Sequence, residues 1–130
     1  MINATKNQLT NVSNPFQGDS KKVLCVCSAG LLRSPTLANV LYKELGYNTR
    51  ACGTAENFAL VPMSEALVHW ADEIVFVDNH CKDYIRIDMK ELLEEYKFDI
   101  KFITLDVEDD YNYMDDELQI ILLEQYMRSK

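Results

Sequence analysis

Residues 22–35 read KVLCVCSAGLLRSP. The apolar run Val23–Val26 has the length of a strand, and its lack of polar alternation predicts that both faces of the strand are buried. Ser34 and Pro35 then predict a helix start, because serine is a favoured N-cap and proline a favoured first helical residue. The stretch therefore predicts a strand, a tight loop and a helix in direct succession.

The alternation of strand and helix continues to the end of the chain. Gly46 ends the first helix, and the further strands are predicted at Thr49–Cys52, Ile74–Val77 and Ile100–Leu105. Helical spacing covers Pro62–Ala71, Asn79–Tyr96 (in two pieces) and Asp115–Met127. This order predicts an α/β fold, a single doubly wound domain with a four-stranded parallel sheet and helices on both faces. The domain is expected over 21–130, after a polar, asparagine-rich extension at 1–20 that is a flexible arm or an irregular packed segment.

The charge of the chain excludes some classes of partner. Its 130 residues carry a formal net charge of −8, which argues against a general nucleic-acid binder. Residues 1–50 hold six basic and two acidic side chains, whereas residues 51–130 hold seven basic and nineteen acidic ones. An anionic ligand is therefore expected to bind the first fifty residues. No apolar run is long enough to span a membrane, so no membrane partner is expected.

The four cysteines indicate reduced thiols. No apolar segment typical of a secretory signal lies in residues 1–20, so we expect a cytoplasmic protein. The cysteines form no Cys-x-x-Cys pair, and His69 and His80 are too few to complete a zinc site. We therefore expect neither a metal nor another cofactor.

The loop that follows the first strand has the composition of an anion site. Its successive backbone N–H groups and the dipole of the following helix attract an anion. Arg33 adds a planar guanidinium suited to two phosphate oxygens. The positive potential favours the thiolate of Cys27, to which Ser34 can donate a hydrogen bond. A lone cysteine at a strand end is more often a small buried residue, but Cys-x5-Arg-Ser-Pro in this setting predicts a nucleophile beside a tetrahedral oxyanion.

Here the chain resembles the low-molecular-weight protein tyrosine phosphatases, whose first strand leads into Cys-x5-Arg-Ser-Pro. Cys52-Gly53-Thr54 is similar to a small residue followed by Gly-Thr in the family, and 71–77 looks like the family's third strand. The segment 107–111 is similar to the one that carries the family's general acid. The resemblance covers roughly 22–127 and is strongest at the loop.

The resemblance implies that the general acid is Asp109, with Asp110 in place of the family's usual proline. Asp110 and Asp106 remain alternatives, because the whole run is acidic and such runs are often only solvated loops. Tyr111 matches an aromatic residue that walls the substrate pocket in the family. Tyr113 is an alternative for that role, and either tyrosine could instead serve packing alone.

Two positions of the loop depart from the family. Gly30 stands where the family commonly has asparagine; both residues tolerate positive φ, so the loop shape can persist without the asparagine's hydrogen bonds. Leu32 replaces a second cysteine, which removes a thiol that could protect the nucleophile as a disulfide.

The resemblance implies a cysteine-dependent phosphomonoester hydrolase, most closely a protein tyrosine phosphatase. The expected catalytic residues are Cys27, Arg33 and Asp109. The expected phosphate- and substrate-binding residues are Ser28, Ala29, Gly30, Leu31, Leu32, Arg33, Ser34 and Tyr111. The expected substrate is a phosphotyrosine-containing protein or a small aryl phosphate, because Leu31, Leu32 and Tyr111 suggest an apolar pocket. Two alternatives stay open: an arsenate reductase on the same scaffold, with Cys81 as a further thiol, and a catalytically silent phosphate-binding module.

Overall fold

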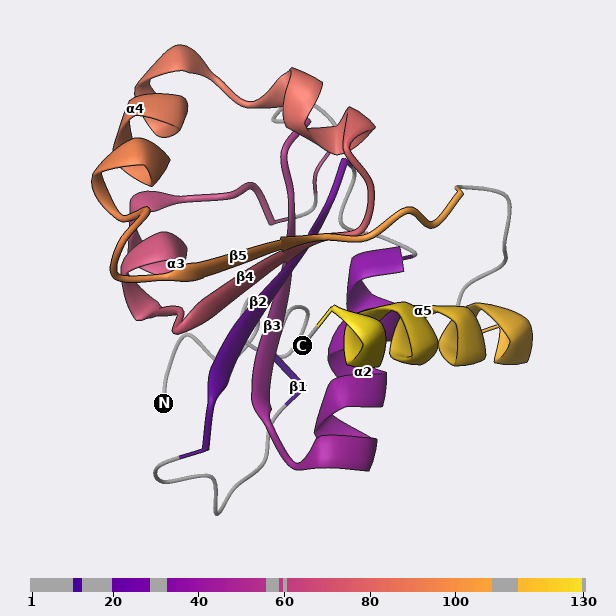
Figure 1. Ribbon diagram of the computed structural model, residues 1–130. Helices are drawn as coiled ribbons and strands as arrows, with labels where there is room; N and C mark the ends of the chain where they lie inside the picture. Colours follow the sequence, from indigo (N-terminus) through magenta and orange to yellow (C-terminus); the bar gives the residue numbers. More distant parts are fainter. Residues whose placement is uncertain are drawn as a thin grey trace.

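A five-stranded sheet forms the centre of the protein in a computed structural model (Figure 1). The structure describes residues 11–12, 20–28, 33–55, 59, 61–108 and 115–129. The strands are β1 (Asn11–Val12), β2 (Lys22–Cys27), β3 (Asn48–Gly53), β4 (Glu73–Phe76) and β5 (Lys101–Thr104). Their spatial order is β1-β3-β2-β4-β5. The four long strands pair in parallel, as predicted, whereas β1 adds an unpredicted antiparallel edge strand beside β3.

Helices cover both faces of this sheet (Figure 1). The described helical elements are α2 (Arg33–Leu45), α3 (Glu65–Trp70), the 3₁₀ helix η1 (His80–Tyr84), α4 (Ile87–Glu95) and α5 (Asp116–Arg128). Buried side chains of α2 and α5 form one core layer with one face of the sheet. Side chains of α3, η1 and α4 form the second layer on the other face. The predicted α/β fold with a doubly covered parallel sheet is therefore confirmed.

The two core layers explain why β2 is apolar at nearly every position. Val23, Cys25 and Cys27 belong to the layer with α2 and α5, whereas Leu24 and Val26 belong to the layer with α3 and α4. A central parallel strand is covered on both faces, so alternation of polar and apolar residues disappears. Cys27 thus lies at the carboxyl end of the central strand, on the side of α2.

Some predicted element boundaries are corrected. The predicted N-cap Ser34 lies inside α2, which begins at Arg33, and the Ser34 side chain is fully buried. The helix predicted over 62–71 is shorter, because Ser64 caps it by accepting a hydrogen bond from the N–H of Leu67. The two helical pieces predicted between Asn79 and Tyr96 are present as η1 and α4.

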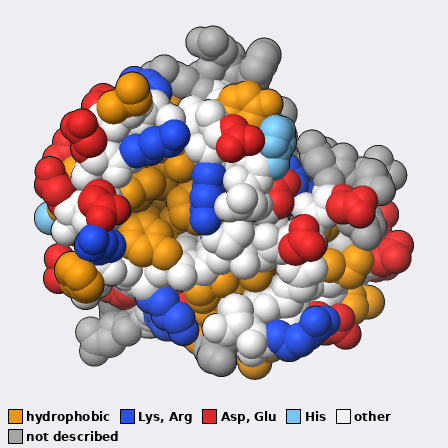
Figure 2. Space-filling view, turned by 45° about the horizontal axis from the view of Figure 1, so that its top comes forward, with side chains coloured by type: hydrophobic (Ala, Val, Ile, Leu, Met, Phe, Trp, Pro, Cys, Tyr) orange, Lys and Arg blue, Asp and Glu red, His pale blue; other side chains and the backbone are white. Residues whose placement is uncertain are grey.

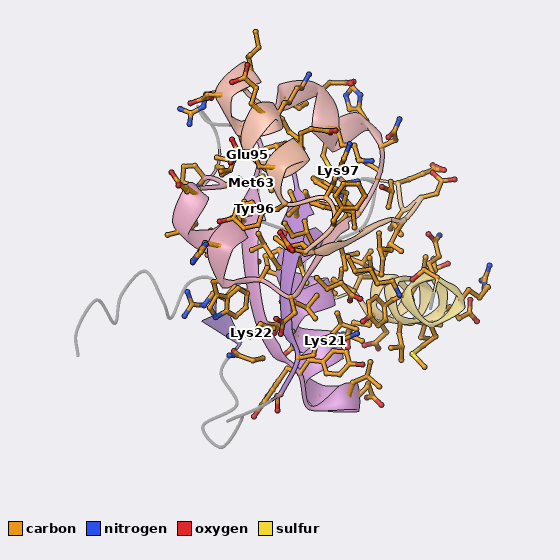
Figure 3. All side chains as sticks on the ribbon, turned by 60° about the vertical axis from the view of Figure 1, so that its left-hand side comes forward. Lys21, Lys22, Met63, Glu95, Tyr96 and Lys97 are labelled. Carbon is orange, nitrogen blue, oxygen red and sulfur yellow. The ribbon has the colours of Figure 1, made fainter. Side chains whose placement is uncertain are left out.

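A buried polar network lies at the amino end of the sheet. Glu73 is 1% exposed, and its carboxylate accepts hydrogen bonds from Tyr126 Oη at 2.6 Å and from Lys21 Nζ at 3.3 Å. Burial, reinforced by the Glu73 carboxylate, raises the pKa of Tyr126. Figure 3 shows Lys21 and Lys22 at the end of the molecule away from Met63. The network therefore joins β4 to α5 far from the carboxyl ends of the strands.

Among the described residues, no helix combines the length and the apolar composition that crossing a membrane requires.

Candidate functional site

The candidate nucleophile Cys27 contacts Ser34 at the carboxyl end of β2. The distance from Cys27 Sγ to Ser34 Oγ is 3.0 Å, and the contact is buried. Ser34 Oγ also lies 3.3 Å from the carbonyl oxygen of Cys52, to which it can donate. A serine hydroxyl has one proton, so it can turn from the Cys52 carbonyl to a Cys27 thiolate. Ser34 is thus placed to stabilise the thiolate, rather than to cap its helix.

The backbone around Cys27 is held by the segment that follows β3. The N–H of Thr54 donates to the Cys27 carbonyl at 2.9 Å, and the N–H of Ala55 donates to the Ser28 carbonyl at 2.8 Å. These bonds continue the parallel pairing past the strand ends, to Ser28 after β2 and to Ala55 after β3. Ser28, the first residue of the predicted anion loop, is thereby fixed through its backbone.

Arg33 begins α2 and is 4% exposed. Its Nη1 atom donates to Asp78 Oδ2 at 2.5 Å and to the carbonyl oxygen of Val107 at 2.8 Å. Asp78 follows β4 and Val107 follows β5, so the guanidinium joins the start of α2 to the carboxyl ends of two strands. Sequence reasoning placed Arg33 at the site, but it did not predict either partner.

Asp78 is a residue of the candidate site that the sequence analysis did not predict. Its second oxygen, Oδ1, accepts from the N–H of Cys81 at 2.8 Å, so the carboxyl group also holds the first turn of η1. Burial alone would raise the pKa of Asp78, but the hydrogen bonds from Arg33 and Cys81 and the charge of Arg33 lower it overall. Asp78 is therefore an ionised anchor for Arg33 and is unsuited to donate a proton at neutral pH. An aspartate immediately after a buried strand is the signal that could have found it.

The acidic run after β5 approaches the site through its backbone. Asp106 is exposed, and its N–H and carbonyl groups both bond to the side chain of Gln125, at 2.7 and 3.0 Å. The next residue, Val107, gives its carbonyl to Arg33. The described start of the run, at Val107, therefore lies beside the guanidinium. The predicted site residues Ala29, Gly30, Leu31, Leu32, Asp109, Asp110, Tyr111 and Tyr113 lie outside the described residues.

The other three cysteines differ from Cys27 in their thiol groups: the Cys27 thiol contacts the Ser34 hydroxyl, whereas Cys52 meets that hydroxyl through its backbone carbonyl. Cys25, Cys52 and Cys81 are fully or almost fully buried free thiols. Burial raises the pKa of Cys25 and Cys52 well above its ordinary value, and it raises the pKa of Cys81 to about 12. Within the described ranges, no group of three or more His, Cys, Asp or Glu side chains is placed to hold a metal ion.

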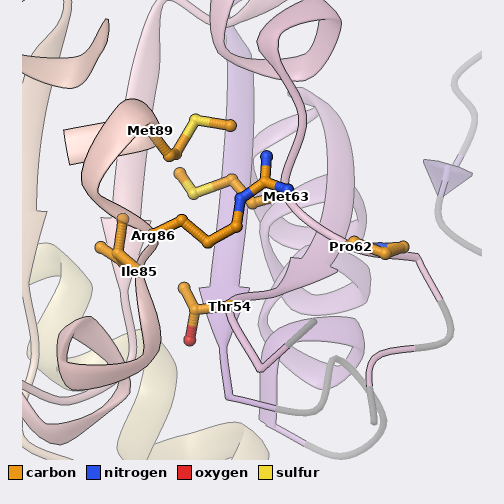
Figure 4. Close-up of a pocket in the computed structure, with 6 residues that line it drawn as sticks. All are labelled: Thr54, Pro62, Met63, Ile85, Arg86 and Met89. Carbon is orange, nitrogen blue, oxygen red and sulfur yellow. The ribbon is translucent and has the colours of Figure 1, made fainter. Parts of the chain in front are cut away.

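A small pocket lies beside the segment that holds Cys27 (Figure 4). Its cavity of about 20 Å³ is lined by Thr54, Pro62, Met63, Ile85, Arg86 and Met89. Thr54 Oγ1 does not face open solvent there, because it donates to the Cys81 carbonyl at 2.5 Å. The pocket admits a water molecule at most, so it does not extend the candidate site to a larger ligand.

Solved structures with the same fold were found by structural comparison, although no protein-family model and no curated protein sequence matches the chain. A mutant of YwlE from Bacillus subtilis superimposes with a TM-score of 0.56 and 18% identity, over 84% of this chain and 99% of the other. The YwlE arginine phosphatase from Geobacillus stearothermophilus gives a TM-score of 0.56 and 16% identity, over 83% of this chain and 93% of the other.

A third similar structure is the thioredoxin-dependent arsenate reductase of Corynebacterium glutamicum. Its TM-score is 0.53 with 16% identity, over 84% of this chain and 58% of that protein. At these identities the likeness concerns the fold. The fold that the loop motif implied, that of the low-molecular-weight protein tyrosine phosphatases, is thereby confirmed.

Proposed function

We propose that this chain, which has the low-molecular-weight phosphatase fold, is a cysteine-dependent phosphomonoester hydrolase that acts on protein phosphotyrosine. The observation that carries the proposal is the buried contact between Cys27 and Ser34, together with the preceding residue Arg33, whose guanidinium is held by Asp78 after β4 and Val107 after β5. A thiolate beside a fixed guanidinium is suited to attack on a phosphoryl group, because the cation stabilises the charge on the phosphoryl oxygens.

In the first step, the Cys27 thiolate attacks phosphorus in line with the leaving oxygen. The S–P bond forms, the P–O bond to the aryl group breaks, and protonated Asp109 gives its proton to the departing phenolate. Arg33 and the N–H groups of the loop hold the three equatorial oxygens.

In the second step, the Asp109 carboxylate takes a proton from water, whose oxygen attacks phosphorus. The S–P bond breaks, and inorganic phosphate leaves with the thiolate restored. No electrons are gained or lost in either step. Asp78 keeps its negative charge throughout and holds Arg33 in position.

The two alternatives make different demands on the site. Arsenate reduction needs further thiols that can exchange disulfides, and the raised pKa values of the buried Cys25, Cys52 and Cys81 disfavour this. A silent phosphate-binding module needs only the loop and Arg33. Two of the similar structures are described as arginine phosphatase, which makes phosphoarginine the competing phosphatase substrate.

The test compares three substrates with the full chain: p-nitrophenyl phosphate, a phosphotyrosine peptide and a phosphoarginine peptide. We expect turnover of both aryl phosphates, no turnover by Cys27→Ser, and full turnover by the matched thiol variant Cys81→Ala. Asp109→Asn should lower kcat by about 10²–10⁴-fold, and Asp110→Asn should not. Acid quenching during turnover should leave phosphate on Cys27, detectable by mass spectrometry.

Each alternative has its own outcome in the same assay. Turnover of phosphoarginine alone would contradict tyrosine specificity but keep the thiol-phosphate chemistry. Binding of the phosphotyrosine peptide without turnover would indicate the silent module. Arsenate-dependent oxidation of thioredoxin that requires Cys81 would indicate the reductase.

A further inference from the structure

An apolar groove lies between α4 and the outer strands of the sheet. Its volume is about 230 Å³, and it is lined by Phe76, Lys82, Ile85, Lys90, Leu93, Glu94, Lys97 and Phe102. Figure 2 shows a hollow with hydrophobic side chains in its floor and basic side chains at its border. The hollow has room for one or two large apolar side chains rather than for a whole small-molecule ligand of the usual size.

Basic side chains dominate the rim of this groove. Three of its four charged lining residues are lysines, in a chain whose net charge is −8. Lys97 pairs with Glu94, but no described carboxylate lies within ion-pair distance of Lys82 or Lys90. Lys82 Nζ lies 5.0 Å from the centre of the Phe76 ring, so a positive charge stands directly over the apolar floor. The groove thus complements an acidic ligand that also has an apolar part.

We propose that the groove binds an acidic segment of a partner protein that carries a large apolar side chain. The apolar side chain fills the space over Phe76 and Phe102, and flanking carboxylates meet Lys82 and Lys90. This binding surface is separate from the Cys27 chemistry and goes beyond the proposed hydrolase function.

The position of β5 favours an extended protein segment as the occupant. Among the described strands, β5 pairs only with β4, so its outer edge has backbone N–H and C=O groups available to another strand. A segment added along that edge places alternate side chains on the face where Phe102 lines the groove. Backbone hydrogen bonds to a strand edge are available from a peptide and not from a lipid. Nucleic acid is disfavoured because the chain as a whole carries a net charge of −8.

The test measures binding of one defined probe, a fluorescein-labelled peptide of sequence EDEFEDLE, by fluorescence anisotropy. We expect saturable binding that weakens with added salt. The double variant Lys82→Glu/Lys90→Glu should bind at least about tenfold more weakly, because it reverses both unpaired charges. Amide signals of Phe76, Leu93 and Phe102 should shift on titration with the peptide.

Two controls separate the groove from general charge effects. Lys43→Glu reverses an exposed charge on α2, on the other face of the sheet, and should leave the affinity unchanged. A peptide with serine in place of phenylalanine should bind much more weakly.

Equal weakening by Lys43→Glu, or no saturation below about 1 mM peptide, would overturn the proposal. Binding of phosphatidylglycerol vesicles in place of the peptide would also overturn it. Hydrolysis of p-nitrophenyl phosphate is a separate readout, and neither lysine variant should alter it.

Discussion

Asp78 holds Arg33 with one carboxylate oxygen and the first turn of η1 with the other. Arg33 is almost fully buried, so loss of Asp78 would remove the carboxylate that faces this interior guanidinium. Leaving the buried charge of Arg33 without this carboxylate would lower the stability of the fold. The Arg33 side chain could then also adopt other rotamers. Asp78 therefore controls both the stability of the site and the direction of its main cation.

We predict that Asp78→Asn lowers kcat/KM by about 10–100-fold, because small displacements of a positioning group have effects of that size. The amide oxygen can still accept from the Cys81 N–H, so the fold should persist. Steady-state kinetics with p-nitrophenyl phosphate measures the loss. Asp83→Asn, at an exposed position on η1, is the matched control and should keep full activity.

The same variant has a defined pH dependence. The pKa of Asp78 is lower in the folded protein, so its ionised form adds stability above the ordinary carboxyl pKa of about 3.9. That stability disappears as the pH falls through the lowered pKa of the folded state. Urea unfolding of both proteins should therefore show a difference that is constant near neutral pH and shrinks in acid. A difference that stays constant down to the acid limit would contradict an ionised Asp78.

Local spacing predicted Cys27, Arg33 and Ser34 as neighbours, since all three belong to one strand–loop–helix stretch. The partner of Arg33 could not be found in this way, because Asp78 is 45 positions away and no short motif joins the two. The contact depends on the order of strands in the sheet. The role of Ser34 was also only half predicted: its hydroxyl faces Cys27, but the helix begins one residue before it.

At the scale of elements, the sequence predicted most clearly the strands whose two faces are both buried. The apolar strands β2 and β4 were found to within one residue, and the last helix, α5, was likewise placed within one residue at each end. The strand β1 was missed, because two residues in a polar segment have no periodicity to detect. Its existence depends on pairing with Thr49 and Arg50, which sequence patterns alone do not specify.

Gly46 ends α2 with a φ of +71°, in the left-handed region that side chains with a Cβ atom disfavour. A Cβ atom added there would meet nothing within 4 Å, so the cost of a substitution is confined to the backbone. We predict that Gly46→Ala lowers the free energy of unfolding by about 1–2 kcal/mol. Urea denaturation measures the change. Gly46→Asn should cost less, because asparagine tolerates this conformation; an alanine variant as stable as the native protein would contradict the prediction.

At the scale of the whole molecule, the sheet separates two polar centres. The Glu73 network lies at the amino end of β4, and Asp78 lies at its carboxyl end, about 16 Å further along an extended chain. One centre joins the sheet to α5, and the other assembles the candidate site. This separation allows stability and activity to be changed independently.

Tyr126→Phe tests this separation. The variant removes the 2.6 Å hydrogen bond to Glu73 but keeps the ring in the core, so we predict a loss of about 1.5–3 kcal/mol in unfolding free energy. The kinetics with p-nitrophenyl phosphate should stay within about twofold of the native protein, since distant sites act independently. A large fall in kcat without a fall in stability would show that the two ends are coupled.

β2 lies in the middle of the sheet, with β3 on one side and β4 on the other. Both its edges are hydrogen-bonded and both its faces are covered, so its amide hydrogens should exchange with solvent only when the entire protein unfolds. Edge strands such as β1 and β5 can open transiently without disturbing it. Cys27 is thus attached to the slowest-exchanging part of the chain, and local opening at either edge of the sheet leaves the sulfur atom in place.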